Sequence, residues 1–207
     1  MAKQTTVDIQ AEQKLKLVTE SIKKMPLTAE NFRSALVQVG RSFLGVSEIG
    51  TTNTGYWVSK FNKDLGLGAA AWCLSYVQFV YKYTSNIFGL KDVLPYNTAS
   101  TQSLWGWAYK NNLTFTDYTL LKPGDIFIWR NGITRLGHTG FLSESAGELV
   151  STLEGNTNSA FSRDGGDVCE HKYSVLRWGP VGVSKKTSRY LRGFVSLDKL
   201  LLFGRII

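Results

Sequence analysis

Residues 122–129 read Lys-Pro-Gly-Asp-Ile-Phe-Ile-Trp, and the character of the chain changes at this point. The apolar run from Ile126 to Trp129 is typical of a short buried strand. Further strand candidates follow it, over residues 138–143, 148–154, 168–178 and 192–197. Upstream of residue 122, apolar residues recur at helical spacing instead. Helices first and a sheet afterwards indicate an α+β domain.

The helices are predicted in the first part of the chain. Apolar residues at helical spacing, among them Leu15 and Ile22, predict a helical arm over residues 1–26, which Pro26 ends. The next predicted helix begins at residues 28–30. Three more are predicted over residues 56–65, 69–83 and 98–110. We therefore divide the chain into an N-terminal arm, residues 1–27, and one domain, residues 28–207, which includes a basic C-terminal segment.

Composition excludes several classes of protein. Of the 207 residues, 43% are apolar and 19% are charged, which is too apolar for a disordered chain. Two cysteines, Cys73 and Cys169, exclude a disulfide-rich scaffold. Two histidines, His138 and His171, and no Cys-x-x-Cys motif argue against a structural zinc site, so we expect neither a metal nor another cofactor.

The N-terminal sequence bears on localisation. Residues 1–16 are polar and lack the apolar segment of a secretory signal, and no run approaches the ~20 apolar residues of a membrane span. We therefore expect a chain that is made in the cytoplasm and that another factor must carry to any target outside it.

Positive charge is concentrated towards the C-terminus. The net charge is +8, and after residue 171 eight basic residues accompany a single acid, Asp198. This excess suggests an anionic partner such as nucleic acid, anionic lipid or an anionic wall polymer. A solvated basic face that only aids solubility explains it equally well. Four of the basic residues lie close together in the sequence: Lys185, Lys186, Arg189 and Arg192.

Cys73 is the candidate nucleophile. It lies near the start of the predicted helix over residues 69–83, where the helix dipole and free N–H groups favour a thiolate. Trp72 places a large apolar group beside the thiol, and we predict that it contacts substrate. By position alone, an inert cysteine on the apolar face of the helix remains the simpler interpretation.

A predicted hairpin brings a base and a carboxylate together. A three-residue loop that ends at a left-handed Gly147 would pair Glu144 with Glu148. This register places His138 directly opposite Glu154, so that the carboxylate can orient the imidazole. A register shift of one residue would move the two side chains to opposite faces.

Together these residues form the layout of a cysteine acyl-transfer site. Cys73 would be the nucleophile, His138 the base and Glu154 the group that orients the base. Asn156 lies on the same strand face as Glu154 and is a further polar candidate. Each residue alone has an ordinary structural explanation, but their combination favours catalysis.

Other residues of the same types remain candidates. His171 is a rival base without an evident partner, and Cys169 is a rival nucleophile in a predicted strand. Asp164 and Asp167 suggest calcium only weakly, because they lack the spacing of an EF-hand loop, and we interpret them as a turn.

Four motifs, in order along the chain, resemble those of CHAP-type and related NlpC-type peptidoglycan hydrolases. They are Gly68-Ala-Ala-Ala-Trp-Cys-Leu-Ser-Tyr-Val, Lys122-Pro-Gly-Asp-Ile-Phe-Ile-Trp, Gly137-His-Thr-Gly-Phe-Leu, and Thr152-Leu-Glu-Gly-Asn-Thr-Asn followed by Ser162-Arg-Asp-Gly-Gly-Asp. The last resembles the Glu-Gly-Asn motif of phage-encoded members. The resemblance covers about residues 30–197. It implies a papain-like α+β fold, with N-terminal helices, a mainly antiparallel sheet and the nucleophile at a helix N-terminus.

The resemblance also implies a reaction and a setting. Cys73 would attack an amide bond of peptidoglycan, in the stem peptide or a cross-bridge, with His138 as base and with Glu154 and Asn156 as polar partners. We expect a phage or prophage lysin that binds peptidoglycan, with anionic wall polymer held by the basic C-terminal segment and no nucleic acid. The alternatives are an injected antibacterial effector, a non-catalytic wall- or nucleic-acid-binding module, and another papain-like enzyme such as a deamidase or transglutaminase.

Overall fold

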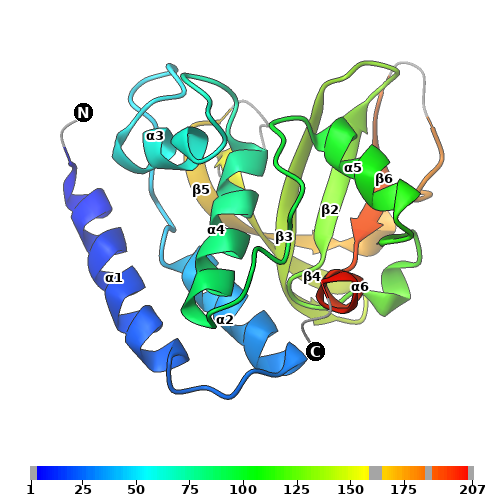
Figure 1. The fold of residues 1–207 in the computed structure, drawn as a ribbon. Coiled ribbons are helices and arrows are strands. Elements are labelled where there is room, and N and C mark those ends of the chain that lie inside the picture. The colour runs from blue at the N-terminus through cyan, green and yellow to red at the C-terminus, as the bar shows by residue number, and fades with distance from the viewer. Residues whose placement is uncertain (1–3, 159–164, 185–187, 205–207) are drawn as a thin grey trace.

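The computed structural model describes residues 4–158, 165–184 and 188–204. Its helices are α1 (Thr6–Ile22), α2 (Ala29–Arg41), α3 (Tyr56–Lys63), α4 (Cys73–Ile87), α5 (Thr101–Lys110) and α6 (Leu197–Phe203). Its strands are β1 (Thr114–Phe115), β2 (Ile126–Asn131), β3 (Gly137–Ala146), β4 (Leu149–Thr157), β5 (Asp167–Ser174) and β6 (Arg189–Val195). Five helices precede the sheet and α6 follows it, which confirms the predicted α+β class (Figure 1).

The six strands form one antiparallel sheet in the order β1-β6-β2-β3-β4-β5. The C-terminal strand β6 lies inside this order, paired with β1 on one side and with β2 on the other. Arg189 and Arg192 of the basic C-terminal segment therefore lie on an inner strand of the sheet rather than on an extended tail.

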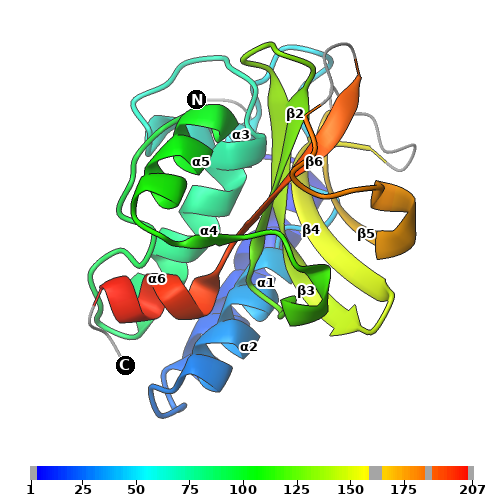
Figure 2. The same cartoon turned by 90° about the vertical axis from the view of Figure 1, so that its right-hand side faces the viewer.

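Side chains of the inner strands alternate between two apolar clusters. Ile126 and Ile128 pack with the helices, whereas Phe127 belongs to a smaller cluster with Leu142 and Phe194. The alternation follows from the two-residue period of a strand. Because both faces of β2 are covered, its sequence is continuously apolar rather than alternating. The helices gather on one side of the sheet in Figure 2.

The predicted N-terminal arm packs against the rest of the chain through α1. Leu15 and Ile22 are buried in the main apolar cluster. The indole Nε1 of Trp57 in α3 donates to the carbonyl of Asp8 at 3.1 Å. These contacts hold α1 against α3 and the main core.

Helix α4 begins at Cys73, four residues later than the apolar pattern predicts. The side-chain amide of Asn62 donates to the carbonyls of Gly68 and Ala70, at 3.1 and 3.0 Å. These bonds hold residues 68–71 in a loop that the sequence pattern alone assigns to the helix. As a result the thiol lies at the first helical position.

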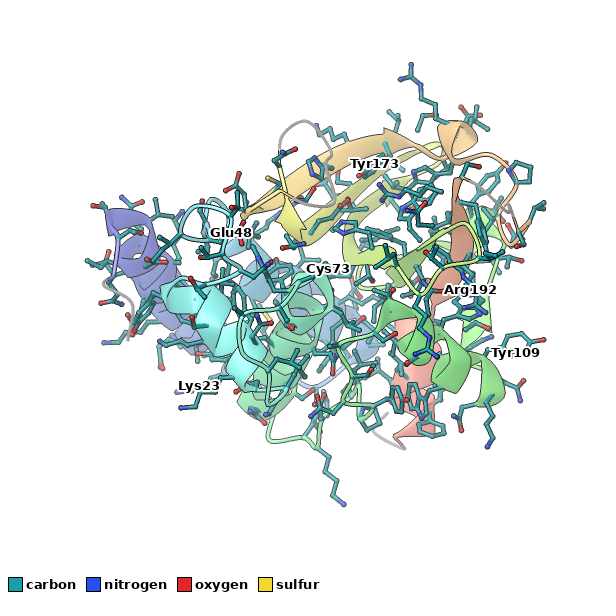
Figure 3. All side chains as sticks on the ribbon, turned by 90° about the horizontal axis from the view of Figure 1, so that it is seen from above. Lys23, Glu48, Cys73, Tyr109, Tyr173 and Arg192 are labelled. Atoms are coloured by element: carbon teal, nitrogen blue, oxygen red, sulfur yellow. The ribbon has the colours of Figure 1, made fainter. Side chains whose placement is uncertain are left out.

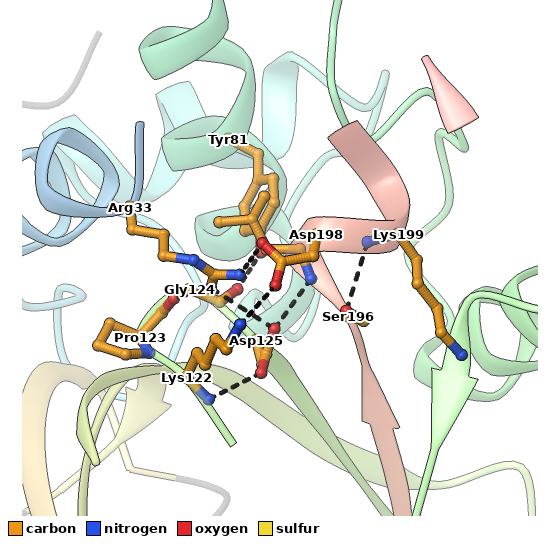
Figure 4. Close-up of polar contacts among 10 residues, drawn as sticks. Arg33, Tyr81, Lys122, Pro123, Gly124, Asp125, Ser196, Asp198 and Lys199 are labelled. Carbon is orange, nitrogen blue, oxygen red and sulfur yellow. Dashed lines mark hydrogen bonds and ion pairs between the residues drawn. The ribbon is translucent and has the colours of Figure 1, made fainter. Parts of the chain in front are cut away.

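The turn that opens β2 joins three parts of the fold (Figure 4). The carboxylate of Asp125 accepts hydrogen bonds from the backbone N–H groups of Lys122 and Leu197, each at 2.9 Å. The hydroxyl of Tyr81 in α4 donates to the carbonyl of Gly124, which has a left-handed φ of 88°. Burial raises the pKa of Asp125 to about 6. The Pro-Gly-Asp sequence thus sets β2 against α4 and α6.

Candidate active site around Cys73

Cys73 stands at the N-terminus of α4 and is 7% exposed. The residue before it, Trp72, takes the N-cap position, and within the described chain no side chain caps the helix. The first N–H groups of α4 therefore stay free of a capping side chain, and the helix dipole favours negative charge there. This is the setting that the sequence predicts for a nucleophilic thiol.

A cleft of about 700 Å³ opens beside Cys73. Residues 99–103, which lead into α5, line it together with residues 135–137, which lead into β3. Gln78 of α4 hydrogen-bonds both the carbonyl and the N–H of Thr98 and so fixes the segment before α5 to the helix of Cys73. Figure 3 looks onto the molecule from above, with Cys73 labelled.

The turn between β3 and β4 is shorter than predicted. Ala146 pairs with Leu149, so only Gly147 and Glu148 form the turn, and the predicted three-residue loop is wrong. Gly147 is left-handed as expected, with a φ of 61°. Glu144 consequently pairs with Ser151 rather than with Glu148.

A bulge at Ser143 decides which face of β4 carries Glu154. Without the bulge, the register at the turn would place Glu154 opposite Phe141, on the face away from His138. With it, Phe141 pairs with Leu153, and Glu154 returns to the face of His138. The two residues are therefore diagonal neighbours, and the directly opposed pairing that the sequence predicts is wrong.

The two side chains nevertheless meet. Nε2 of His138 donates to Oε2 of Glu154 at 2.7 Å, and both residues are buried, at 2% and 1% exposed. Gly140 makes this possible, because a Cβ at that position would lie 2.8 Å from Cγ of Glu154. The side chain of Glu154 therefore passes over Gly140 of β3 to contact the imidazole of His138.

The electrostatics of the pair favour an imidazolium. Burial alone would lower the pKa of His138, but its interactions with the Cys73 thiol and the Glu154 carboxylate outweigh burial and raise the pKa to about 9. Burial would raise the pKa of Glu154, yet His138 more than offsets it and the pKa is lowered. Nε2 of His138 is hydrogen-bonded to Glu154. Nδ1 makes no hydrogen bond within the described residues, so it is the ring nitrogen available to the thiol.

Two further side chains hold Glu154, and neither is among the residues that we predicted for the site. The hydroxyls of Thr152 and Tyr173 donate to Oε1 of Glu154, at 2.6 and 2.9 Å. Thr152 lies two residues before Glu154 on the same strand face, a spacing that could have identified it. Tyr173 comes from β5, and no local signal in the sequence indicates its contact.

Asn156 occupies a second bulge, between β4 and β5. It is 5% exposed and left-handed, with a φ of 56°. Gly155 before it lies on the indole of Trp72, where a Cβ would come within 2.7 Å of the ring. Trp72 is fully buried, so it supports the segment from Glu154 to Asn156 and has no exposed surface for the substrate contact that we predicted.

One comparison with known proteins found a match. Residues 65–156 match the family model described as the CHAP domain. This finding supports a peptidoglycan hydrolase family that acts on the cell wall, and it agrees with a papain-like fold. No curated protein and no solved structure matched the chain.

The CHAP domain match contains Cys73, His138, Glu154 and Asn156. It ends before β5 and β6, although both strands belong to the same sheet. Tyr173 therefore lies beyond the matched residues while its hydroxyl holds the carboxylate of Glu154.

The rival residues have different surroundings. His171 is buried, its Nε2 lies 3.3 Å from the hydroxyl of Thr157, and burial lowers its pKa. Burial raises the pKa of Cys169 to about 11, which disfavours its thiolate. Asp167 accepts a hydrogen bond from the hydroxyl of Ser47 at 2.7 Å, and Asp164 lies outside the described residues.

Metal ligands and membrane-spanning helices can be sought in the part of the chain that the structure describes. No group of three or more His, Cys, Asp or Glu residues there is placed to hold a metal ion. None of the described helices is long and apolar enough to cross a membrane. Among the clustered basic residues, Arg189 lies 4.7 Å from the centre of the Trp129 ring, and Lys185 and Lys186 fall outside the described residues.

Proposed function

We propose that this chain is a cysteine amidase or endopeptidase that cleaves an amide bond of peptidoglycan. Cys73 is the nucleophile, His138 the general acid and base, and Glu154 the group that orients His138. The observation that carries this proposal is the buried His138–Glu154 pair, whose imidazole interacts with a thiol at the start of a helix and beside a cleft. The CHAP domain supplies the substrate class.

The first step forms an acyl-enzyme. The thiolate of Cys73 attacks the carbonyl carbon of the amide, and the negative charge moves to the carbonyl oxygen. The backbone N–H of Cys73, at the uncapped start of α4, is positioned to stabilise that oxygen. As the C–N bond breaks, the imidazolium of His138 gives its proton to the leaving amine.

The second step releases the product. Neutral His138 takes a proton from a water molecule, which attacks the thioester carbonyl of the acyl-enzyme. The C–S bond then breaks, the carboxylic acid product leaves and loses its proton to the solvent, and the thiolate–imidazolium pair is restored. Throughout, Glu154 stabilises the charged form of His138 and fixes the ring so that Nδ1 faces the thiol.

Several neighbours have supporting roles in this proposal. Thr152 and Tyr173 are positioning residues that hold the carboxylate of Glu154. Asn156, on the bulge after Glu154, is a second polar partner of the site. Trp72 is assigned to packing beneath that segment because it is fully buried.

We also propose a setting and a division of the chain. The enzyme acts as a phage or prophage lysin after release to the wall, and genes beside its own would distinguish this from an injected effector. The domain of residues 28–207 is catalytic, and the arm of residues 1–27 serves it by packing through α1. Exposed basic residues of the C-terminal segment hold anionic wall polymer, so wall binding should weaken as salt rises towards ~0.5 M.

The test is hydrolysis of purified peptidoglycan with a matched pair of cysteine variants. We expect Cys73→Ala to abolish release of soluble fragments and to leave the circular dichroism spectrum unchanged. Cys169→Ala should keep nearly full activity, because burial disfavours the thiolate there. Mass spectrometry of the released fragments identifies the bond that is cut. An active Cys73→Ala variant, or an inactive Cys169→Ala variant, would overturn the assignment.

A further inference from the structure

Three arginines gather at the end of the sheet beside α5. Arg130 lies on β2, Arg135 lies in the loop that follows it, and Arg192 lies on β6. Leu191 and Gly193 both pair with β2, whereas Arg192 between them does not, so Arg192 is the extra residue of a bulge. Bulges redirect side chains, and they are common beside active sites.

The bulge turns Arg192 towards α5. Its Nη1 donates to Oε1 of Gln102 at 2.8 Å, and its guanidinium lies 5.2 Å from the centre of the Trp105 ring. Nε2 of Gln102 donates in turn to the carbonyl of Trp129 at 3.0 Å, which fixes the amide. A guanidinium has five N–H donors, so this contact leaves most of them for another partner.

No acid balances these three arginines. Within the described residues, none of them forms an ion pair with a carboxylate. The sequence explains this, because residues 99–116, 126–143 and 171–197 contain neither Asp nor Glu. Arg192 is half-buried, and burial together with the charge of Arg130 lowers its pKa. A partly desolvated cation beside another cation is unfavourable until an anion joins them.

Part of this group lines the cleft of Cys73. Gln102 and Arg135 are both lining residues. Arg192 donates to Gln102, which places its guanidinium next to a residue of the cleft. Figure 3 labels Cys73 over α4 and Arg192 beside α5.

We infer that Arg135 and Arg192, positioned with Gln102, form a subsite for a carboxylate of the substrate peptide close to the scissile amide. The inference rests on the proposed peptidoglycan-hydrolase function of this cleft. A planar guanidinium matches a carboxylate with two parallel hydrogen bonds, which gives both affinity and orientation. The subsite borders the cleft that holds the thiol, so its ligand belongs to the peptide that is cleaved and not to a separate wall polymer.

The experiment compares soluble muropeptides that differ only in amidation. One has free carboxyl groups, a second has an amide at the side-branch carboxyl of the stem, and a third has an amide at the C-terminal carboxyl. We expect the wild type to show about a tenfold higher KM for one of the two amidated peptides. That peptide identifies which carboxylate is bound.

Variants then locate the subsite. Arg135→Gln and Arg192→Gln should each raise KM for the free-acid peptide about tenfold, with kcat within about twofold, and should leave KM for the matching amidated peptide unchanged. Arg192→Lys keeps the charge but loses the planar guanidinium. Its KM for the free-acid peptide should lie between those of the wild type and Arg192→Gln. Lys14→Gln, on an exposed face of α1, removes the same charge far from the cleft and should have no effect. Because Arg135 is exposed, its variant tests the subsite even if Arg192→Gln fails to fold.

The subsite is overturned if Arg135→Gln and Arg192→Gln raise KM equally for the free-acid and the amidated peptides. It is also overturned if Lys14→Gln raises KM for the free-acid peptide as much as they do. If the wild type cleaves none of the peptides, the proposed function fails instead. In that case calorimetry with the Cys73→Ala variant still measures whether the free-acid peptide binds more tightly than its amide, and equal binding rejects the subsite independently.

Discussion

Replacing Glu154 by glutamine removes the charge beside His138 while nearly preserving the shape of the side chain. The native carboxylate is 1% exposed and accepts hydrogen bonds from His138, Thr152 and Tyr173. A hydrogen bond between charged groups contributes about 1.5–3 kcal/mol. The rise in the pKa of His138 from 6.5 to about 9 corresponds to about 3 kcal/mol in favour of the imidazolium, shared between Cys73 and Glu154.

We therefore expect Glu154→Gln to lose about 2–3 kcal/mol of transition-state stabilisation, which is about a 30- to 150-fold fall in kcat/KM. Removing the carboxylate also lowers the pKa of His138. The alkaline limb of the pH–rate profile should then move to lower pH, because the imidazolium is lost earlier. The assay is hydrolysis of a soluble muropeptide across about pH 5 to 10.

Glu144→Gln provides the matched control. Glu144 is an exposed glutamate on β3 that pairs with Arg41, and its replacement should leave kcat/KM and the pH profile unchanged. The reasoning is refuted if Glu154→Gln stays within threefold of the wild type and keeps its alkaline limb. A fall in kcat/KM that appears only as a loss of folded protein would also count against it.

The remaining predictions concern the surroundings of the pair. Asn156→Ala should reduce kcat/KM less than Glu154→Ala, and the reverse order would make Asn156 the residue that orients the base. Tyr173→Phe should lower kcat/KM about tenfold through loss of one hydrogen bond that positions the carboxylate, and should keep an alkaline limb where Glu154→Gln loses it to lower pH; a kcat/KM within twofold of the wild type would contradict the positioning role of Tyr173. Gly155→Ala should destabilise the protein by about 1–3 kcal/mol in urea unfolding, because its methyl group would press on the indole beneath it; equal stability would contradict that packing. Since the folded-state pKa of His138 is raised, its stabilising contribution is present below about pH 6.5 and is lost as the pH rises through about 9, by at most about 3 kcal/mol. Urea unfolding across that range should show the loss in the wild type and a smaller loss in Glu154→Gln.

Local sequence patterns predict the order of the elements and the residue types of the site. Thr28 was readable as a helix start, and it accepts a hydrogen bond from the N–H of Asn31 at 3.1 Å. The run from Ile126 to Trp129 was readable as a buried strand because it is continuously apolar. Such signals lie within a few residues of one another, so they depend little on the rest of the fold. The same holds for placing Cys73 near a helix start and His138 on a strand.

How these residues meet depends on contacts between distant parts of the chain. The bulge at Ser143 returns Glu154 to the face of His138, and the predicted register missed it because a bulge is set by how the sheet packs rather than by local composition. Tyr173 and Arg192 reach the site from β5 and β6, which follow the hairpin by many residues. Trp72 is apolar in sequence and equally compatible with a cleft wall or a core, and only the packing of Gly155 on its ring shows that it is core. Periodicity is a property of neighbouring residues, whereas these contacts join strands whose pairing no short stretch of sequence specifies.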